Sequence, residues 1–327
     1  MKTLRIALYA GDGIGVDVVE QAVHVLQHVE DLLGSFRLDL TPVPWGCRYH
    51  ADHGVVAPPD FLEVLRPFDA ILLGALGDPR CLPDHVTLEP LVRMRQAFDQ
   101  YACVRPARLY PGVPSPLGRP GDIDMVVVRE NSEGEYFSCG GRFHPGEDDE
   151  VAIQTAVHTR RGIERVLRFG FELAVSRRGR LTMVTKSNAL RYGMVLWDEV
   201  LEKVRADFPQ VRAERQHVDA AAMSFVRRPA EYDVVVASNL FGDILTDLSG
   251  AITGSIGMNP SANINPERRF PSMFEPVHGS APDIAGQGIA NPTAAVLSTA
   301  MMLEWLGEGE GARRIRSAVA AALAGGA

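Results

Sequence analysis

Residues 233–248, DVVVASNLFGDILTDL, join a short apolar run to a longer segment with helical spacing. The run 233–237 is almost continuous valine, which is typical of a strand covered on both faces, as in a parallel sheet. The residues after it are apolar at the period of a helix. A strand that leads directly into a helix is the building unit of an α/β fold.

The same alternation extends outward over the rest of the chain. Further buried strands are predicted at 4–10, 69–74, 124–129 and 181–185, and helices at 16–33, 160–176 and 190–208. The Pro- and Gly-rich segment 106–122 is expected to be a loop or sheet edge. The polar segment 142–150 lies between residues that favour strands and predicts a protruding arm. The fold class is therefore α/β.

The helix after residue 238 carries two acidic residues on one face. Asp243 and Asp247 are four residues apart, so their carboxylates stand one turn apart and repel each other. A divalent cation such as Mg²⁺ or Mn²⁺ would relieve this repulsion, whereas two solvated aspartates on an outer face explain the spacing equally well. Asp219 is a lone acid in an apolar run, and a metal is one candidate partner for it.

Three arginines stand near the ends of predicted elements. The planar guanidinium groups of Arg95, Arg105 and Arg129 suit carboxylate binding, although a surface ion pair is the commoner role of any single arginine. Lys186 also follows a strand and could act as a base beside a metal. Tyr136 is a candidate acid. Spacing along the sequence does not show whether these side chains converge.

Two glycine-rich segments are candidates for ligand binding. The turn Gly11-x-Gly13-x-Gly15 lies between a strand and a helix, but Val16 stands where the dinucleotide fingerprint requires its third glycine. The segment 275–292 is rich in Gly, Ser and Pro and offers free backbone N–H groups, as in a ligand-binding loop. A plain turn and an ordered surface loop are the competing interpretations.

Composition excludes several classes of protein. The 327 residues carry 33 Lys and Arg against 41 Asp and Glu, a net charge of −8, so nucleic acid is not an expected partner. The four cysteines form no C-x-x-C pair, which indicates a reducing compartment and argues against a structural zinc site. No stretch approaches the roughly 20 apolar residues of a membrane helix and no signal peptide is evident. A cytoplasmic protein is expected.

Taken together, the motifs resemble the metal-dependent, decarboxylating β-hydroxyacid dehydrogenases, the isocitrate/isopropylmalate dehydrogenase family. The resemblance covers most of the chain and rests on motifs in the family's order: GDGIG at 11–15, Arg95, VRP at 104–106, REN at 129–131, Tyr136, TKSN at 185–188, VD at 218–219, NLFGDILTD at 239–247 and HGSAPD at 278–283. Within the family, GALGDPR at 74–80 and SANINPERRFP at 261–271 are most similar to the tartrate and D-malate dehydrogenases.

The resemblance implies a fold distinct from the usual Rossmann fold. It implies two α/β domains with parallel and mixed sheets, one formed by residues 1–100 and 254–327 and one by residues 101–253. An arm near 135–155 would help to form a homodimer. Active sites would be shared between the subunits, with Lys186 and Asp219 coming from the neighbour.

The resemblance also assigns roles to residues. Tyr136, Lys186 and Asp219 would be catalytic, Arg95, Arg105 and Arg129 would bind substrate, and Asp219, Asp243 and Asp247 would bind Mg²⁺ or Mn²⁺. NAD would contact Ile14, His278, Gly279, Ser280, Ala281, Asp283 and Asn291. Asp283 is expected to favour NAD over NADP. K⁺ is left open as an activator.

The implied activity is the NAD- and metal-dependent oxidation and decarboxylation of a small 2-hydroxy diacid of the tartrate or D-malate type. Residues 86–95 are expected to lack the acidic residue of isopropylmalate enzymes and the Ser/Asn pair of isocitrate enzymes. Oxidation of 3-isopropylmalate or a related alkylmalate remains an alternative. A non-catalytic regulatory subunit is a second alternative, although such chains lose site residues that this chain keeps.

Overall fold

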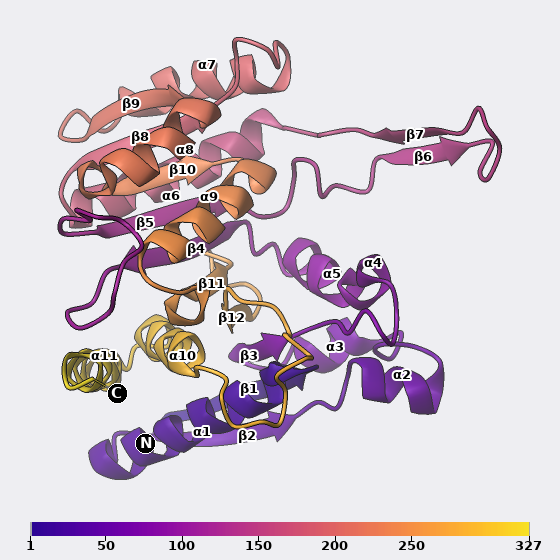
Figure 1. The fold of residues 1–327 in the computed structure, drawn as a ribbon, viewed down its shortest axis with the longest axis vertical. Coiled ribbons are helices and arrows are strands. Elements are labelled where there is room, and N and C mark those ends of the chain that lie inside the picture. The colour runs from indigo at the N-terminus through magenta and orange to yellow at the C-terminus, as the bar shows by residue number, and fades with distance from the viewer. Residues whose placement is uncertain (1, 327) are drawn as a thin grey trace.

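The computed structural model describes residues 2–326 and confirms an α/β fold with a large mixed sheet (Figure 1). Ten strands form one sheet in the order β2-β1-β3-β12-β11-β4-β5-β10-β8-β9. They are β1 (Lys2–Gly11), β2 (Phe36–Pro42), β3 (Ala70–Ala75), β4 (Ala102–Arg108), β5 (Asp124–Glu130), β8 (Arg180–Thr185), β9 (Arg212–His217), β10 (Val234–Ala237), β11 (Pro260–Ile264) and β12 (Ser272–Pro276). The remaining two, β6 (Gly140–Phe143) and β7 (Val151–Gln154), form a separate hairpin.

Helices connect the strands and cover the sheet. They are α1 (Ile14–Leu33), α2 (Cys47–His53), α3 (Phe61–Leu65), α4 (Asp84–Thr87), α5 (Glu89–Ala97), α6 (Arg160–Ser176), α7 (Gly193–Arg205), α8 (Val218–Arg227), α9 (Asn239–Ile252), α10 (Thr293–Trp305) and α11 (Gly309–Ala324), with short 3-10 turns η1 (Pro229–Glu231) and η2 (Ile256–Met258). Among residues 2–326, no helix combines the length and apolarity that crossing a bilayer requires.

The sheet changes strand direction at its centre. The pairs β1–β3, β12–β3, β10–β5 and β10–β8 are parallel, as continuous apolar strands predict, whereas β11–β12, β11–β4 and β4–β5 are antiparallel. Strands from the two ends of the chain fill one half of the sheet and strands from the middle fill the other. The domain division expected from the resemblance runs between β11 and β4, and it remains a prediction.

The core explains why the apolar runs become central strands. Val234, Val235 and Val236 are fully buried, because β10 lies between β5 and β8 and helices cover both faces. Helix α6 packs on the same sheet: adding a Cβ to its Gly170 would place that atom 2.4 Å from Val236. The Thr159 side chain begins α6 by accepting a hydrogen bond from the Gly162 amide, as a helix cap does.

Most predicted elements are present with small differences in length. The helix predicted at 160–176 has those bounds, while α1 begins two residues earlier than predicted, at Ile14, and α7 is shorter than the predicted segment 190–208. Strand β4 continues to Arg108, so the expected loop at 106–122 begins later than predicted. The polar arm is the tip of the β6–β7 hairpin, which projects away from the body (Figure 1).

Candidate active site

Three arginines that are far apart in the sequence line one cavity. Arg95 comes from α5, Arg105 from β4 and Arg129 from the end of β5, and all three are buried. The cavity has a volume of about 240 Å³, and Tyr136 and Asp243 line it as well. The convergence that sequence spacing could not show is therefore present. Three guanidinium groups in one small cavity create a site for a compact anion that carries more than one carboxylate.

A buried acid holds Arg95 in place. The Arg95 Nη2 atom donates to Glu275 Oε1 at 2.8 Å, and both side chains are more than nine-tenths buried. The Asn263 amide donates to the same oxygen at 2.7 Å. Glu275 lies on β12 and lines the cavity, but sequence reasoning did not single it out. Glu275 and Arg95 are 180 residues apart, so no pattern of neighbouring residues could predict that they pair.

Asp243 lines the cavity and accepts hydrogen bonds from three of the side chains around it. Arg105 Nη1 donates to it at 3.1 Å, Arg129 Nη1 makes a second ion pair, and the Tyr136 hydroxyl donates at 2.8 Å. Burial opposes ionisation of this carboxyl, but the charges of Arg129 and Arg105 outweigh burial and lower its pKa. Burial and the Asp243 charge raise the pKa of Tyr136, which keeps its phenol protonated.

Two further polar side chains orient the arginines. Arg129 Nε donates to Asn239 Oδ1 at 2.9 Å, and Arg105 Nη1 donates to Thr246 Oγ1 at 2.7 Å. Both partners lie on α9, the helix that carries Asp243. Both residues belong to the motif at 239–247, but neither was predicted to have a role. Helix α9 therefore supplies acceptors to two arginines as well as its acidic pair.

Asp247 lies one turn beyond Asp243, and its pKa is shifted in the opposite direction. Its side chain is exposed at the surface, yet partial desolvation together with the nearby Asp243 charge raises the pKa of its carboxyl. Hence the repulsion that the spacing predicted is present. Mg²⁺ and Mn²⁺ prefer hard oxygen ligands such as carboxylates, and a cation between the two aspartates would relieve their repulsion. The pair therefore fits such an ion.

Lys186 and Asp219 form a second, separate group. Their side chains make an ion pair at 2.9 Å, and neither residue lines the cavity of the arginines. Lys186 hydrogen-bonds to the Asp219 carboxylate and lowers its pKa. Within residues 2–326, the three aspartates predicted as metal ligands do not form one cluster; the single cluster of three ligand-type side chains is the exposed group His144, Glu147 and Asp149 on the arm. One chain alone does not assemble the predicted site.

The glycine turn and the loop after β12 meet, although they are far apart in sequence. The Ile14 amide donates to the Ser280 carbonyl at 2.7 Å. Gly13 has φ 55°, and a Cβ added there would lie 2.0 Å from that carbonyl oxygen, so only glycine fits. His278 and Gly279 line the arginine cavity. The two segments predicted to bind a cofactor thus form one continuous backbone surface next to the anion site.

The other residues predicted to contact the cofactor lie further along the same segment of the chain, up to the start of α10. Ala281 has a positive φ of 35°, and the carbonyl of Asp283 accepts a hydrogen bond from Gln287 Nε2 at 2.7 Å. Asn291 Oδ1 accepts from the Thr293 amide at 3.0 Å, at the start of α10.

One expectation about the segment before Arg95 was wrong. The segment does contain an acidic residue, Glu89, at the start of α5. Its carboxylate pairs with Arg93 at 3.3 Å, and both side chains are about half exposed. Neither residue lines the arginine cavity.

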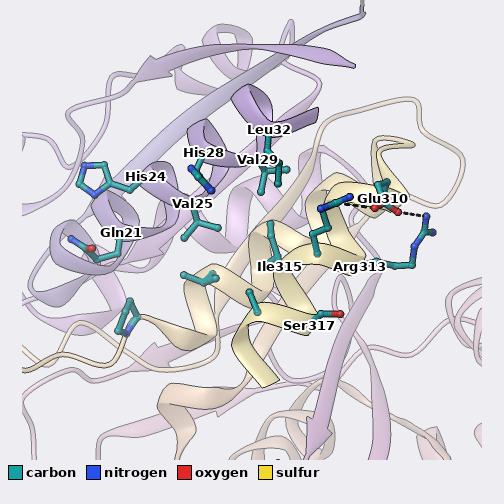
Figure 2. Close-up of a pocket in the computed structure, with 14 residues that line it drawn as sticks. Gln21, His24, Val25, His28, Val29, Leu32, Glu310, Arg313, Ile315 and Ser317 are labelled. Atoms are coloured by element: carbon teal, nitrogen blue, oxygen red, sulfur yellow. Dashed lines mark hydrogen bonds and ion pairs between the residues drawn. The ribbon is translucent and has the colours of Figure 1, made fainter. Parts of the chain in front are cut away.

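A larger groove lies elsewhere on the molecule. It has a volume of about 920 Å³ and lies between α1, α10 and α11, where Val25, Val29 and Ile315 form an apolar floor and Arg313 pairs with Glu310 at the rim (Figure 2). None of the predicted site residues lines it. Volume alone therefore does not locate the site; the arginine cavity is smaller but carries the convergent charged groups.

Comparison with known proteins agrees with this geometry. Residues 5–327 match the isocitrate/isopropylmalate dehydrogenase family. The chain is 53% identical over 315 residues to the D-malate dehydrogenase [decarboxylating] of Escherichia coli strain K12, a match that covers 95% of this chain and 87% of that protein. It is 48% identical over 314 residues to the tartrate dehydrogenase/decarboxylase of Pseudomonas putida, covering 94% of this chain and 86% of that protein.

A solved structure of the same family has a similar fold. The crystal structure of isocitrate dehydrogenase from Methylococcus capsulatus superposes with a TM-score of 0.89 and 36% identity, and the match covers 99% of this chain and 91% of that one. The family match, the relatives and the fold agree with one another. The chain belongs to the isocitrate/isopropylmalate dehydrogenase family and is an oxidoreductase of the decarboxylating dehydrogenase type.

Proposed function

We propose that this chain catalyses the NAD- and divalent-metal-dependent oxidation and decarboxylation of a small 2-hydroxy diacid of the D-malate or tartrate type. The observation that carries the proposal is the cavity of about 240 Å³ where Arg95, Arg105 and Arg129 surround Asp243. Its size suits a four-carbon diacid, and its charge suits two carboxylates. The relatives named for D-malate and tartrate support the same substrate class.

Asp243 and Asp247 would hold a divalent ion together with Asp219 of a second copy. Such an ion would act as a Lewis acid, acidifying the substrate hydroxyl and stabilising the charge that develops when CO₂ leaves. The arginines would then be freed from Asp243 to bind the substrate carboxylates. Asp243 is the acceptor for Arg105 and Arg129 in this structure, so a bound substrate carboxylate would replace it as their partner.

Two groups would move protons. Lys186, held by Asp219 at 2.9 Å, would accept the proton of the substrate hydroxyl. Tyr136 would donate a proton to the carbon that loses CO₂, a role consistent with the upward shift of its pKa. Replacing Lys186 with Met should abolish turnover while the variant still binds Mn²⁺ and NAD⁺. Turnover at the wild-type rate would remove Lys186 from this role.

The cofactor would occupy the surface formed by Ile14, His278, Gly279, Ser280, Ala281, Asp283 and Asn291. The Asp283 carboxylate would bind the ribose hydroxyls of NAD and repel the 2′-phosphate of NADP. Initial rates measured with each cofactor test this preference, and equal or faster use of NADP would contradict it. Adding K⁺ to the same assay shows whether a monovalent cation activates the enzyme.

A panel of 2-hydroxy diacids tests the substrate class. D-malate, tartrate, 3-isopropylmalate and isocitrate are each assayed with NAD⁺ and Mn²⁺, and NADH and CO₂ are measured separately. We expect D-malate or tartrate to give the highest kcat/KM, with CO₂ released in step with NADH for D-malate. Fastest turnover of 3-isopropylmalate would favour the alkylmalate alternative, and no turnover of any diacid would favour the regulatory subunit.

A further inference from the structure

Two cysteines from separate segments lie against each other beside the cofactor surface. Cys47 begins α2 and is partly buried, while Cys81 is exposed in the turn after β3. The Cys81 Sγ atom lies 3.8 Å from the Cys47 carbonyl oxygen.

A buried carboxylate already holds the two segments in register. Asp12 Oδ1 accepts from the Cys47 amide at 2.7 Å, and Asp12 Oδ2 accepts from the Gly77 amide at 2.9 Å. Gly46 fits against the same carboxylate: a Cβ there would lie 2.6 Å from Asp12 Oδ1. The contact between the cysteines is therefore built into the fold and does not depend on surface side chains alone.

The turn that carries Cys81 also touches the cofactor loop. Arg80 Nη2 donates to the Pro282 carbonyl at 3.4 Å, and the Cys81 amide donates to the Asp78 carbonyl at 2.8 Å. A covalent change at Cys81 thus acts one residue from a contact with the loop proposed to bind NAD.

We propose that Cys47 and Cys81 form a thiol-modification site that reacts with small-molecule disulfides such as oxidised glutathione and closes to an intramolecular disulfide. The part that concerns NAD rests on the proposed function. Exposed Cys81 first attacks the small disulfide, forming a mixed disulfide and releasing one thiol. Cys47 then attacks the Cys81 sulfur and releases the second thiol. Both cysteines are oxidised and the glutathione disulfide is reduced to two thiols, so atoms and electrons balance.

The order of attack follows from the surroundings of the two thiols. Burial raises the pKa of Cys47 to about 12, and the neighbouring Cys81 and Asp12 act in the same direction. Cys47 is therefore a poor first nucleophile. Once the Cys81 sulfur is held in a mixed disulfide, its hydrogen bond to the Cys47 thiol is lost, and one cause of the raised pKa of Cys47 disappears.

The first experiment follows the thiols. The whole protein is incubated with oxidised glutathione, and free thiols and linked peptides are identified by alkylation and mass spectrometry. We expect the control Cys139→Ser to lose two thiols in a Cys47–Cys81 linkage that dithiothreitol reverses, and wild type to form the same linkage in addition to any adduct on the exposed Cys139. Cys47→Ser should stop at a glutathione adduct on Cys81. A wild type that also stops at this adduct, or that does not react, would overturn the proposal.

The second experiment measures NADH binding by fluorescence before and after oxidation. Because the disulfide would tether the turn whose Arg80 contacts the Pro282 carbonyl, we expect the Kd for NADH to rise about threefold or more in wild type and Cys139→Ser, and not in Cys81→Ser. An unchanged Kd in the linked protein would refute the coupling to the cofactor. Failure of the reduced protein to bind NADH would refute the proposed cofactor and leave the thiol result standing.

Discussion

Asp243 and Asp247 stand one turn apart on α9, yet their surroundings shift their pKa values in opposite directions. Asp243 is paired with Arg105 and Arg129, which lower its pKa, while partial desolvation and the Asp243 charge raise the pKa of Asp247. A carboxyl whose pKa is lowered in the folded state stabilises the fold at pH values above its unfolded pKa. A carboxyl whose pKa is raised in the folded state destabilises the fold at pH values above its folded pKa. At neutral pH, Asp243 therefore stabilises the metal-free protein against unfolding, and Asp247 destabilises it.

Replacing Asp243 with Asn should destabilise the metal-free protein. The change removes the charge that compensates Arg129, which is almost fully buried, and Arg105. Because the Asp243 side chain is about one-third exposed, we expect a discounted loss of about 1–2 kcal/mol, measured by urea unfolding with EDTA at pH 7. The loss should shrink as pH falls through the lowered pKa of Asp243, since the wild-type carboxyl then also becomes neutral. A variant as stable as wild type at pH 7 would contradict the assigned ion pairs.

Replacing Asp247 with Asn should stabilise the metal-free protein. The amide removes repulsion from Asp243, so the metal-free protein should gain a few tenths of a kcal/mol at pH 7, a figure reduced by solvent screening. This gain should vanish as pH falls through the raised pKa of Asp247. The same variant should lose the rise in Tm that Mn²⁺ gives the wild type, because a proposed metal ligand is gone. Asp52→Asn, an exposed change on α2, serves as the control.

At the scale of the element, α9 is fitted closely to the strand that carries Arg129. A Cβ added to Gly242 would lie 2.7 Å from Arg129 Cβ, a distance that requires one of them to move. Gly242→Ala should therefore displace the Arg129 head group and raise KM for the diacid about tenfold or more, while kcat changes less. Gly250→Ala is the matched control, because its added methyl group meets Asn259 and not an arginine.

The two variants separate positioning from helix stability. Alanine favours a helix over glycine by about 1 kcal/mol, and this gain partly offsets the destabilising clash of the added methyl group in both variants. Tm therefore does not distinguish the two variants, and KM is the informative measurement. An equal rise in KM in both would show that α9 responds as a whole and that Gly242 has no particular fit to Arg129.

The elements themselves were largely predictable, and the reason is local. The bounds of α6 and the existence of β5, β8 and β10 follow from apolar periodicity, which needs only neighbouring residues. The pairing of Arg95 with Glu275, and of Arg129 with Asn239, could not be predicted that way. These pairs are 180 and 110 residues apart, and they depend on which strands become neighbours.

At the scale of the whole molecule, the order of the strands determines what the site contains. Strands β4 and β11 pair antiparallel at the centre of the sheet and bring elements from the ends and the middle of the chain together. Arg95 and Glu275 reach the cavity from the end segments, and Arg105, Arg129 and Asp243 reach it from the middle. Continuous apolar strands predict parallel pairing, so the apolar runs alone did not locate the antiparallel centre, although the family resemblance implied a mixed sheet.

The separation of Lys186 from this cavity leads to a prediction about two subunits. If each site combines Asp243 of one subunit with Lys186 of the other, a dimer of one Lys186→Met and one Asp243→Asn subunit has one intact site and one doubly altered site. Equal coexpression makes about half of the dimers mixed, so activity should recover to about one-quarter of the wild-type value. Each variant alone should be inactive. The assay is NADH formation by the purified mixture, with subunit composition measured by mass spectrometry. Because a site contained within one chain gives no recovery in any mixture, an inactive mixed dimer would show that Lys186 and Asp243 act within the same subunit.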